Sequence, residues 1–424
     1  MADLNPPVKS ALCKGASDGC AAEVRVIHAR KVVTVSPRGT IRDGAIAVQG
    51  SVIAAVGTRE EISALYPDAE LIYAGAVLTP GLIDCHAHNL EFGPSTAFGA
   101  TKEEQWQRAS DLIMRAMRGG ITSLGEHVLG FFILGRSIEE YKAFRDTLPV
   151  RILISAGTCS LGTDPPVYMC SALGGVMAPR GALVDAEALK VMAAQTEFPG
   201  EHAMGTFTPA NLPPEATPLA GAAFLSPVEV AAMVEAYHAA GKKCGLHTEG
   251  SQIVQDFIDA GGDVVHHGHN IAPHLLDVMA EKGIPLVATP VGGTSSRPNS
   301  PEEVLDAVKR GVRVSIATDS VLPPHPRASW LPIKGGRLVY SGDLTAVAHS
   351  AMVALVEAGF DEGQALAMIT LNPAGILGIE GRAGSLEPGK DADIIACDAI
   401  PGLEAYDPEN IHLVMSRGKA LHQG

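Results

Sequence analysis

The sequence predicts an α/β protein in which a (β/α)8, TIM-like barrel carries a small β-sandwich domain formed by the N- and C-terminal segments. Three observations support this class. β-Rich runs occur at both ends of the chain, apolar runs alternate with amphipathic stretches between them, and histidines and acids follow several of these runs. With 424 residues, 46% of them hydrophobic, the chain can bury a large core without disulfides or a structural metal.

Both ends of the chain have the pattern of short β-strands. Residues 24–27 and 45–48 are β-rich runs separated by turn residues, as in a small antiparallel sheet. Residues 392–396 and 411–415 are similar runs, so the chain can return to that sheet. The predicted organisation is a flexible tail over residues 1–22, a small β domain from residues 23–78 and 383–424, and a catalytic barrel over residues 79–382.

The middle of the chain has the pattern of repeated β-α units, which predicts a parallel sheet. Ser226 and Ser300 each precede a proline and stand three residues before a glutamate, a signal for the start of a helix. Residues 161–181 have no clear period and are expected to form a loop over the barrel mouth. Eight apolar runs, the number that closes a barrel, are found at residues 82–83, 121–124, 150–154, 203–207, 244–246, 264–265, 285–288 and 312–317.

The charge balance excludes several classes of partner. Lys and Arg number 32 against 47 Asp and Glu, and the resulting net charge of -15 would repel phosphate backbones and anionic lipids. We therefore expect a small-molecule substrate and no nucleic-acid or membrane partner. The polar N-terminus lacks a secretory core, which predicts a cytoplasmic location. The seven cysteines include no CxxC pair, so neither a disulfide framework nor a cysteine zinc site is expected.

The strongest functional signal follows the first apolar run, where His86 and His88 flank one alanine. Side chains alternate along a strand, so both imidazoles point to one side and can reach one metal ion. Cys85 faces the other side and is interpreted as a packing residue. For the pair alone, two structural histidines remain the alternative.

Three later apolar runs end on further metal-binding residue types. His247, His267 and Asp319 each follow such a run, at the strand ends where barrel enzymes place their active sites. Together with His86 and His88 they form the predicted set of metal ligands. The neighbouring His266 should point away from His267 and pack behind the strand.

Several segments resemble the amidohydrolase superfamily, over about residues 23 to 420. The similarity is to the branch that holds imidazolonepropionase-like and related amide hydrolases. The segments that carry it are residues 80–88, 120–123, 266–268, 317–320, 372–374 and 384–393.

This resemblance implies a metal-dependent hydrolase that attacks a non-peptide C–N bond, in a cyclic amide or a small N-acyl or amide substrate. One or two divalent metals per chain, with Zn2+ as the expected ion, would be bound by His86, His88, His247, His267 and Asp319. His267 and Asp319 are also expected to be catalytic. The metal would lower the pKa of bound water, Asp319 would accept its proton as general base, and the hydroxide would attack the substrate before Asp319 protonates the leaving nitrogen. Homo-oligomers are also expected.

The sequence departs from the family pattern on the fourth strand. Binuclear members bridge their metals there with a carboxylated lysine or sometimes a glutamate, but no lysine lies between residues 193 and 241. Glu201 and His202 are expected at the start of this strand, the wrong end for the site. The bridge is therefore sought among Glu126, Glu249 and His202, with a supporting role for Glu126 as the alternative.

Glu249 carries the main alternative function. Two residues after His247, it could be a ligand, a proton shuttle or a solvated loop carboxylate. As a shuttle it would serve a deaminase of a heterocyclic base with one metal; a peptidase, a lactonase and a non-catalytic scaffold are less favoured. His269, Arg297 and Arg327 are the expected substrate-binding residues. Either arginine could bind a carboxylate, because a guanidinium offers a planar fork of donors. A surface role for both arginines is the alternative.

Overall fold

The structure is a computed structural model of the chain. It describes residues 23–91, 100–128, 136–161, 167–170, 176–179, 186–206, 221–293, 296–333 and 336–423. The predicted tail over residues 1–22 lies outside this range. No helix in the described part of the chain is long and apolar enough to cross a membrane.

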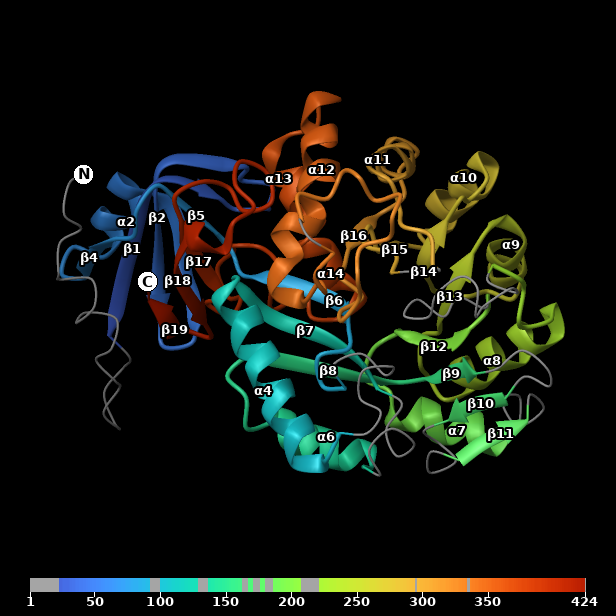
Figure 1. Ribbon diagram of the computed structural model, residues 1–424. Coiled ribbons are helices and arrows are strands. Elements are labelled where there is room, and N and C mark those ends of the chain that lie inside the picture. The colour runs from blue at the N-terminus through green and yellow to red at the C-terminus, as the bar shows by residue number, and fades with distance from the viewer. Residues whose placement is uncertain are drawn as a thin grey trace.

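The two ends of the chain build one sheet, as the terminal β-rich runs predict. Its strand order is β19-β18-β17-β5-β1-β2-β3, with β4 paired to β1. Figure 1 shows the blue N-terminal strands beside the red C-terminal ones. Ile27, Ile46, Leu78, Ile394 and Met415 form part of its buried core. The strands are β1 (Val24–Val33), β2 (Thr40–Gln49), β3 (Val52–Thr58), β4 (Glu70–Tyr73), β5 (Val77–Pro80), β17 (Ile394–Cys397), β18 (Ile411–Ser416) and β19 (Lys419–Gln423).

The described residues include eight parallel strands in the middle of the molecule, and each overlaps one of the predicted apolar runs. The first three are paired in the order β6-β7-β8 and the other five in the order β12-β13-β14-β15-β16. Ala87 and Ser320 form a parallel bridge that joins the two groups at one seam. The strands are β6 (Leu82–Ala87), β7 (Ile121–Val128), β8 (Arg151–Ala156), β12 (Glu201–Met204), β13 (Gly245–Glu249), β14 (Val264–His269), β15 (Leu286–Ala288) and β16 (Val314–Ile316).

Helices lie outside these strands (Figure 1). The two predicted helix starts are confirmed, because Ser226 and Ser300 both form capping boxes with the glutamate three residues later. The helices are α2 (Arg59–Leu65), α4 (Lys102–Arg118), α6 (Ile138–Arg145), α7 (Ala186–Gln195), α8 (Pro227–Ala239), α9 (Ser251–Asp259), α10 (Pro273–Lys282), α11 (Pro301–Lys309), α12 (Leu344–Glu357), α13 (Glu362–Ala367) and α14 (Leu371–Ile376), with 3-10 turns at Ser341–Asp343 and Pro408–Asn410.

The expectation of a loop over residues 161–181 is wrong for the stretches that the structure describes. β9 (Thr158–Leu161), β10 (Val167–Cys170) and β11 (Val176–Pro179) pair in antiparallel fashion into a small sheet. Each strand has only four residues, too short to show a period in the sequence. The residues between these strands lie outside the described part of the chain.

A group of paired charges joins the parallel strands to the terminal sheet. Arg151, at the start of β8, places its guanidinium 2.5 Å from an Asp391 oxygen and 3.0 Å from an Asp393 oxygen. The other Asp393 oxygen accepts hydrogen bonds from Ser416 Oγ and the Arg417 amide. We call this group the Arg151 junction.

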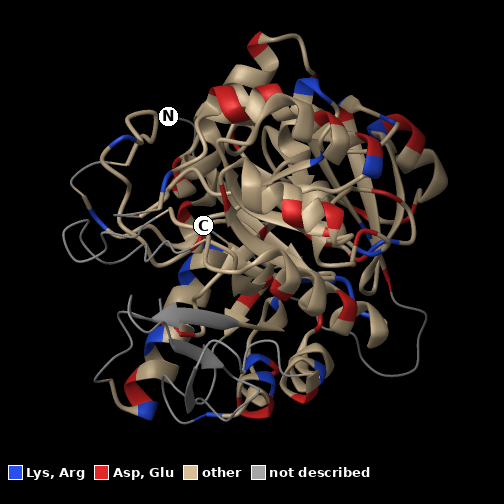
Figure 2. Ribbon diagram, turned by 90° about the vertical axis from the view of Figure 1, so that its right-hand side faces the viewer, with Lys and Arg blue, Asp and Glu red and all other residues tan. Residues whose placement is uncertain are grey.

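Figure 2 shows acidic and basic residues interspersed over the face turned to the viewer.

Candidate metal centre

The five predicted ligands lie close together, although they come from strands far apart in the sequence. His86 is on β6, and His88 follows it directly. His247 and His267 are on β13 and β14, and Asp319 follows β16. Asp319 Oδ1 lies 3.4 Å from His86 Nε2 and 3.2 Å from His88 Nε2. The carboxyl ends of the parallel strands therefore meet at one polar site.

Glu201 is the residue that the sequence argument misplaced. Its Oε2 lies 2.9 Å from His247 Nδ1, 2.8 Å from His267 Nε2 and 3.7 Å from His86 Nε2, in the middle of the site. β12 begins at Glu201 rather than at residue 203, and its pairing with β13 is irregular between Glu201 and Met204. The expectation that Glu201 lies at the wrong end is thus wrong, because its long side chain reaches from the start of a very short strand.

His202, considered as a possible bridge, does not enter the site. Its ring stacks on Tyr237 with 4.0 Å between ring centroids, and its Nδ1 lies 3.3 Å from the Ala156 carbonyl oxygen. Burial lowers the pKa of His202 to about 4, so the ring is neutral. Successive residues of a strand point to opposite faces, and so Glu201 faces the site while His202 packs behind β12.

Three groups of three residues within the described chain have a geometry that could hold a metal ion, and two of them contain the residues that face the site. These two are His86, Glu201 and His267, and His86, His88 and Asp319; the ligand atoms of each group lie within 4.8 Å of one another. His86 Nε2 belongs to both groups, is buried, and makes no hydrogen bond to the described residues. Carboxylate oxygens of Asp319 and Glu201 lie 3.4 and 3.7 Å from this nitrogen, so a metal ion could be bound by all three, and the donor set fits such an ion.

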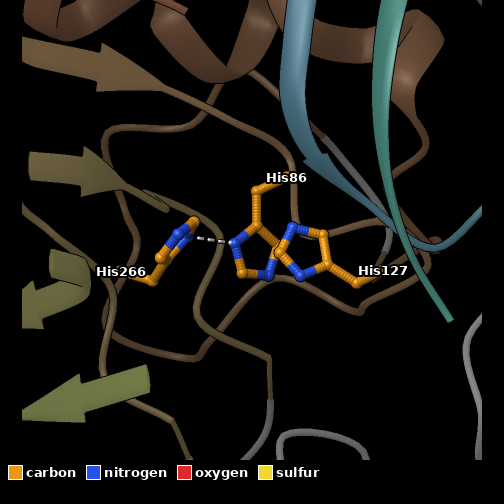
Figure 3. Close-up of side chains that lie close together, drawn as sticks. All are labelled: His86, His127 and His266. Carbon is orange, nitrogen blue, oxygen red and sulfur yellow. Dashed lines mark hydrogen bonds between the residues drawn. The ribbon is translucent and has the colours of Figure 1, made fainter. Parts of the chain in front are cut away.

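Hydrogen bonds behind the site fix the tautomer of His86. His266 Nε2 lies 3.0 Å from the Pro199 carbonyl oxygen, which can only accept, so this nitrogen carries the proton. His266 Nδ1 must then accept from His86 Nδ1, 2.9 Å away (Figure 3). His86 Nε2 is thereby left with a free lone pair that faces the site. The position of His266 behind the strand agrees with the sequence expectation.

His88 is oriented in the same way. Its Nδ1 lies 3.1 Å from the His127 carbonyl oxygen and therefore donates, which leaves Nε2 to face Asp319. His127 also stacks on His86 with 4.0 Å between ring centroids (Figure 3), and its Nδ1 accepts from the Glu201 amide at 3.0 Å. His86, His127 and His266 lie close enough to hold an ion. We interpret them instead as a support for the site, because both ring nitrogens of His266 are already bonded.

The charges of the site are strongly coupled. Burial raises the pKa of Asp319, but contacts with His86 and His88 outweigh it and hold that pKa below the usual range. Burial also raises the pKa of Glu201, but the contacts with His247 and His267 outweigh it. They hold this pKa well below its usual value, and His247 contributes most. Burial lowers the pKa of His88, and the contact with Asp319 raises it to about 9. Coupling of this kind is typical of functional sites.

Glu126 supports the site rather than bridging it. Its two carboxylate oxygens accept hydrogen bonds from Asn89 Nδ2 at 2.7 Å and from the Leu90 amide at 2.9 Å. Burial raises the pKa of Glu126 to about 7, although these two hydrogen bonds lower it. Both oxygens are thus used to hold the segment that follows His88, as the alternative reading of this residue expects. Cys85 is fully buried in an apolar cluster and packs as predicted.

The remaining candidates lie on the strands and loops beside the ligands. Glu249 and His269 are partners in the β13–β14 register. Arg297 Nε lies 3.7 Å from Glu249 Oε1, and His269 Nδ1 lies 3.2 Å from Glu303 Oε1. Glu249 Oε2 and His269 Nε2 are buried without a hydrogen bond to the described residues. The Glu249 side chain is only 12% exposed, so it is not a solvated loop carboxylate.

Arg327 is placed close to the same region. Its backbone amide donates to His325 Nδ1 at 3.0 Å. Burial, followed by the positive charges of Arg327, Arg297 and His269, lowers the pKa of His325. The three predicted substrate-binding residues therefore all act electrostatically on His325, which the sequence argument did not single out.

The chain belongs to the amidohydrolase family. The family model described as "Amidohydrolase family" matches residues 77–421, and a second one, the bacterial imidazolonepropionase-like composite domain, matches residues 44–69. This confirms the expected membership and the expected hydrolase acting on C–N bonds.

Among curated relatives, the imidazolonepropionase of Sphingopyxis alaskensis is 25% identical over 85% of this chain and 87% of its own. The enamidase of Eubacterium barkeri is 23% identical over 89% of each chain. Two crystal structures, of an amidohydrolase and of the A. niger ochratoxinase, superpose with TM-scores of 0.70 and 0.71. They are 18% and 19% identical to this chain, cover 95% of it, and are themselves covered to 99% and 96%. These structures share its fold.

Proposed function

We propose that the protein hydrolyses a C–N bond of a cyclic amide or of a small N-acyl or amide compound, and that it uses two divalent cations, with Zn2+ as the expected ion. The observation that carries this proposal is the position of Glu201, whose Oε2 lies between His247 and His267 and also faces His86. Glu201 lies on β12, the fourth parallel strand, and its carboxylate would supply the bridge for which no lysine is present there.

The proposed scaffold is a (β/α)8 barrel over residues 79–382, with the terminal sheet as a separate small domain. The number of parallel strands and the bridge between Ala87 and Ser320 support a closed barrel. At the other seam, a Cβ on Gly157 would lie 2.6 Å from the Glu201 carbonyl oxygen, so glycine permits the chain after β8 to approach β12. The cytoplasmic location and the homo-oligomer stay predictions.

The proposed ligands divide between two ions. His86, His88 and Asp319 would hold one ion, His247 and His267 the other, and Glu201 would be shared. A divalent metal at such a site polarises a carbonyl group and makes water acidic enough to attack it at neutral pH. Asp319 is ionised at neutral pH because its pKa is held low, so it can accept the proton of the attacking water and return it to the leaving nitrogen.

The residues beside the ligands favour a substrate with an anionic group. Arg297 is 51% exposed, and its distance of 3.7 Å from Glu249 is too long for a hydrogen bond. With Arg327 it brings positive charge to the region, so a carboxylate on the substrate could be bound there while the C–N bond reaches the ions.

Metal content tests the central proposal. Protein purified without chelator is expected to contain two equivalents per chain by elemental analysis, and Glu201→Gln is expected to lose at least one, because an amide is a poor bridging ligand. Glu235→Gln, which removes an exposed charge on α8, is the matched control. One equivalent in the wild type, unchanged by Glu201→Gln, would contradict the binuclear site.

A deaminase of a heterocyclic base, with one ion, is the second candidate, and Glu249 favours it. The buried Glu249 Oε2 without a hydrogen bond is suited to carry a proton. If this candidate is correct, ammonia will be released from the substrate and Glu249→Gln will lower kcat at least about a hundredfold. If amide hydrolysis is correct, the change in kcat should stay below about tenfold, since Asp319 then carries the proton.

A further inference from the structure

A cavity lies at the opposite ends of the strands that carry the site. It has a volume of about 400 Å³, which is within the range of small-molecule pockets. Its wall includes the residues that precede β13, β14, β15 and β16, whereas His247 and His267 lie within β13 and β14, and Asp319 follows β16. The cavity therefore opens on the other side of the strands from the metal centre, and none of its lining residues is a proposed ligand.

Three basic side chains line this cavity. They are Lys243 before β13, Lys282 at the end of α10, and Arg313 directly before β16. None of them has an ion pair with a carboxylate in the described part of the chain, although Asp and Glu outnumber Lys and Arg by 47 to 32 in the sequence. Unpaired positive charge gathered around one hollow is unexpected on a protein this acidic.

The acid in the wall is already occupied. Asp263 Oδ2 accepts hydrogen bonds from His238 Nε2 and from the Cys244 amide, both at 2.8 Å. Asp263 thus holds the entry to β13 in place and does not form an ion pair with Lys243, Lys282 or Arg313. Three positive charges against one leave the cavity with an excess of two, so a ligand with at least two negative charges would complement it.

The backbone also leaves room around the arginine. A Cβ added at Gly375 on α14 would lie 3.4 Å from Arg313 Nη1, so the guanidinium lies against the helix where glycine has no side chain. Gly261 and Gly283, which end the helices before β14 and β15, have φ of +83° and +70°, a conformation that favours glycine. Turns without side chains keep the cavity open beside the three cations.

We propose that this cavity is a binding site for a small organic polyanion that carries phosphate or carboxylate groups. The lysine ammonium groups would attract the charge, and Arg313 would offer its planar fork of donors to two oxygens of one group. The three cations are not among the proposed metal ligands, so this proposal can be tested separately from the proposed function.

Titration calorimetry at constant ionic strength tests this proposal on the full chain with its metals bound. Glycerol 2-phosphate serves as the phosphate monoester and succinate as the dicarboxylate, which separates the two sources of charge. The wild type should bind at least one probe saturably. A variant with Lys243→Ala, Lys282→Ala and Arg313→Ala should bind it about tenfold more weakly or worse.

A second triple variant controls for net charge. Lys142→Ala, Lys190→Ala and Lys419→Ala removes the same charge from positions that do not line the cavity, and it should bind as the wild type does. If both triple variants bind the probe equally, the binding is elsewhere and the proposal is wrong. Failure of the wild type to bind either probe also overturns it. If the cavity triple variant unfolds, the single change Arg313→Gln, at an exposed residue, is measured in its place.

Discussion

The metal centre and the Arg151 junction are both buried and rich in charge, but their polar atoms are satisfied in different ways. At the junction, Arg151 is paired with Asp391 and Asp393, whose remaining contacts are also hydrogen bonds within the chain. At the centre, His86 Nε2 and Glu249 Oε2 have no hydrogen bond to the described residues. Paired charge stabilises the fold, whereas unpaired buried atoms indicate where a ligand binds.

The comparison therefore predicts which property each variant will change. Variants at the metal centre should alter turnover or metal binding with little effect on the free energy of unfolding of the metal-free chain. Variants at the junction should do the reverse. Three changes test this division, beginning with the largest expected effect.

Asp319→Asn should lower kcat by about a thousandfold or more, because an amide cannot accept the proton of the attacking water. The metal should be largely retained, since the amide oxygen keeps the size and position of a ligand. Turnover and metal content are measured on the same preparation. Activity equal to that of the wild type would rule out Asp319 as the general base.

Arg151→Ala should lower the free energy of unfolding by about 3 kcal/mol, because the buried Asp393 loses its ion pair and Asp391 keeps only the exposed Arg382. Urea unfolding of the metal-free protein measures the change. The turnover per folded molecule should stay as in the wild type. Arg59→Ala breaks an exposed ion pair with Asp43 and is the control, for which little change is expected.

His266→Phe should weaken metal binding by about 10- to 100-fold, because His86 then loses the acceptor that fixes its tautomer. A competition titration with a chromogenic chelator measures the dissociation constant. His266→Gln can still donate to Pro199 and accept from His86, so it should restore part of the affinity. Equal affinity in the Phe variant and the wild type would show that this hydrogen bond does not orient His86.

The positions of the strands were predictable because burial leaves a local mark in the sequence. Each parallel strand overlaps an apolar run, and Ser226 and Ser300 begin helices through contacts that span only three residues. The set of five proposed ligands followed from the same logic, since each one stands a few residues after the start or the end of an apolar run. The local sequence pattern was sufficient to predict a candidate residue wherever that residue lies within a few positions of an apolar run.

What the sequence did not show depends on distance in space rather than along the chain. The role of Glu201 depends on where a four-residue strand begins and on the reach of a long side chain toward β13 and β14. The support from His266 depends on a contact with His86, 180 positions earlier. No periodicity or motif in the sequence indicates either contact.

The residues of the site come from both ends of the barrel segment, and this affects how the protein should be handled. Asp84 and Thr318, which flank the proposed ligands His86 and Asp319, are joined by a hydrogen bond across 234 positions of the chain. The complete ligand set therefore exists only in the fully assembled molecule, and an ion bound there would not bind the unfolded chain equally well. Free metal at a hundred times its dissociation constant would then add about 2.7 kcal/mol to the free energy of unfolding. Chelating buffers would act on this protein as mild denaturants, and its melting temperature would report the metal concentration of the sample.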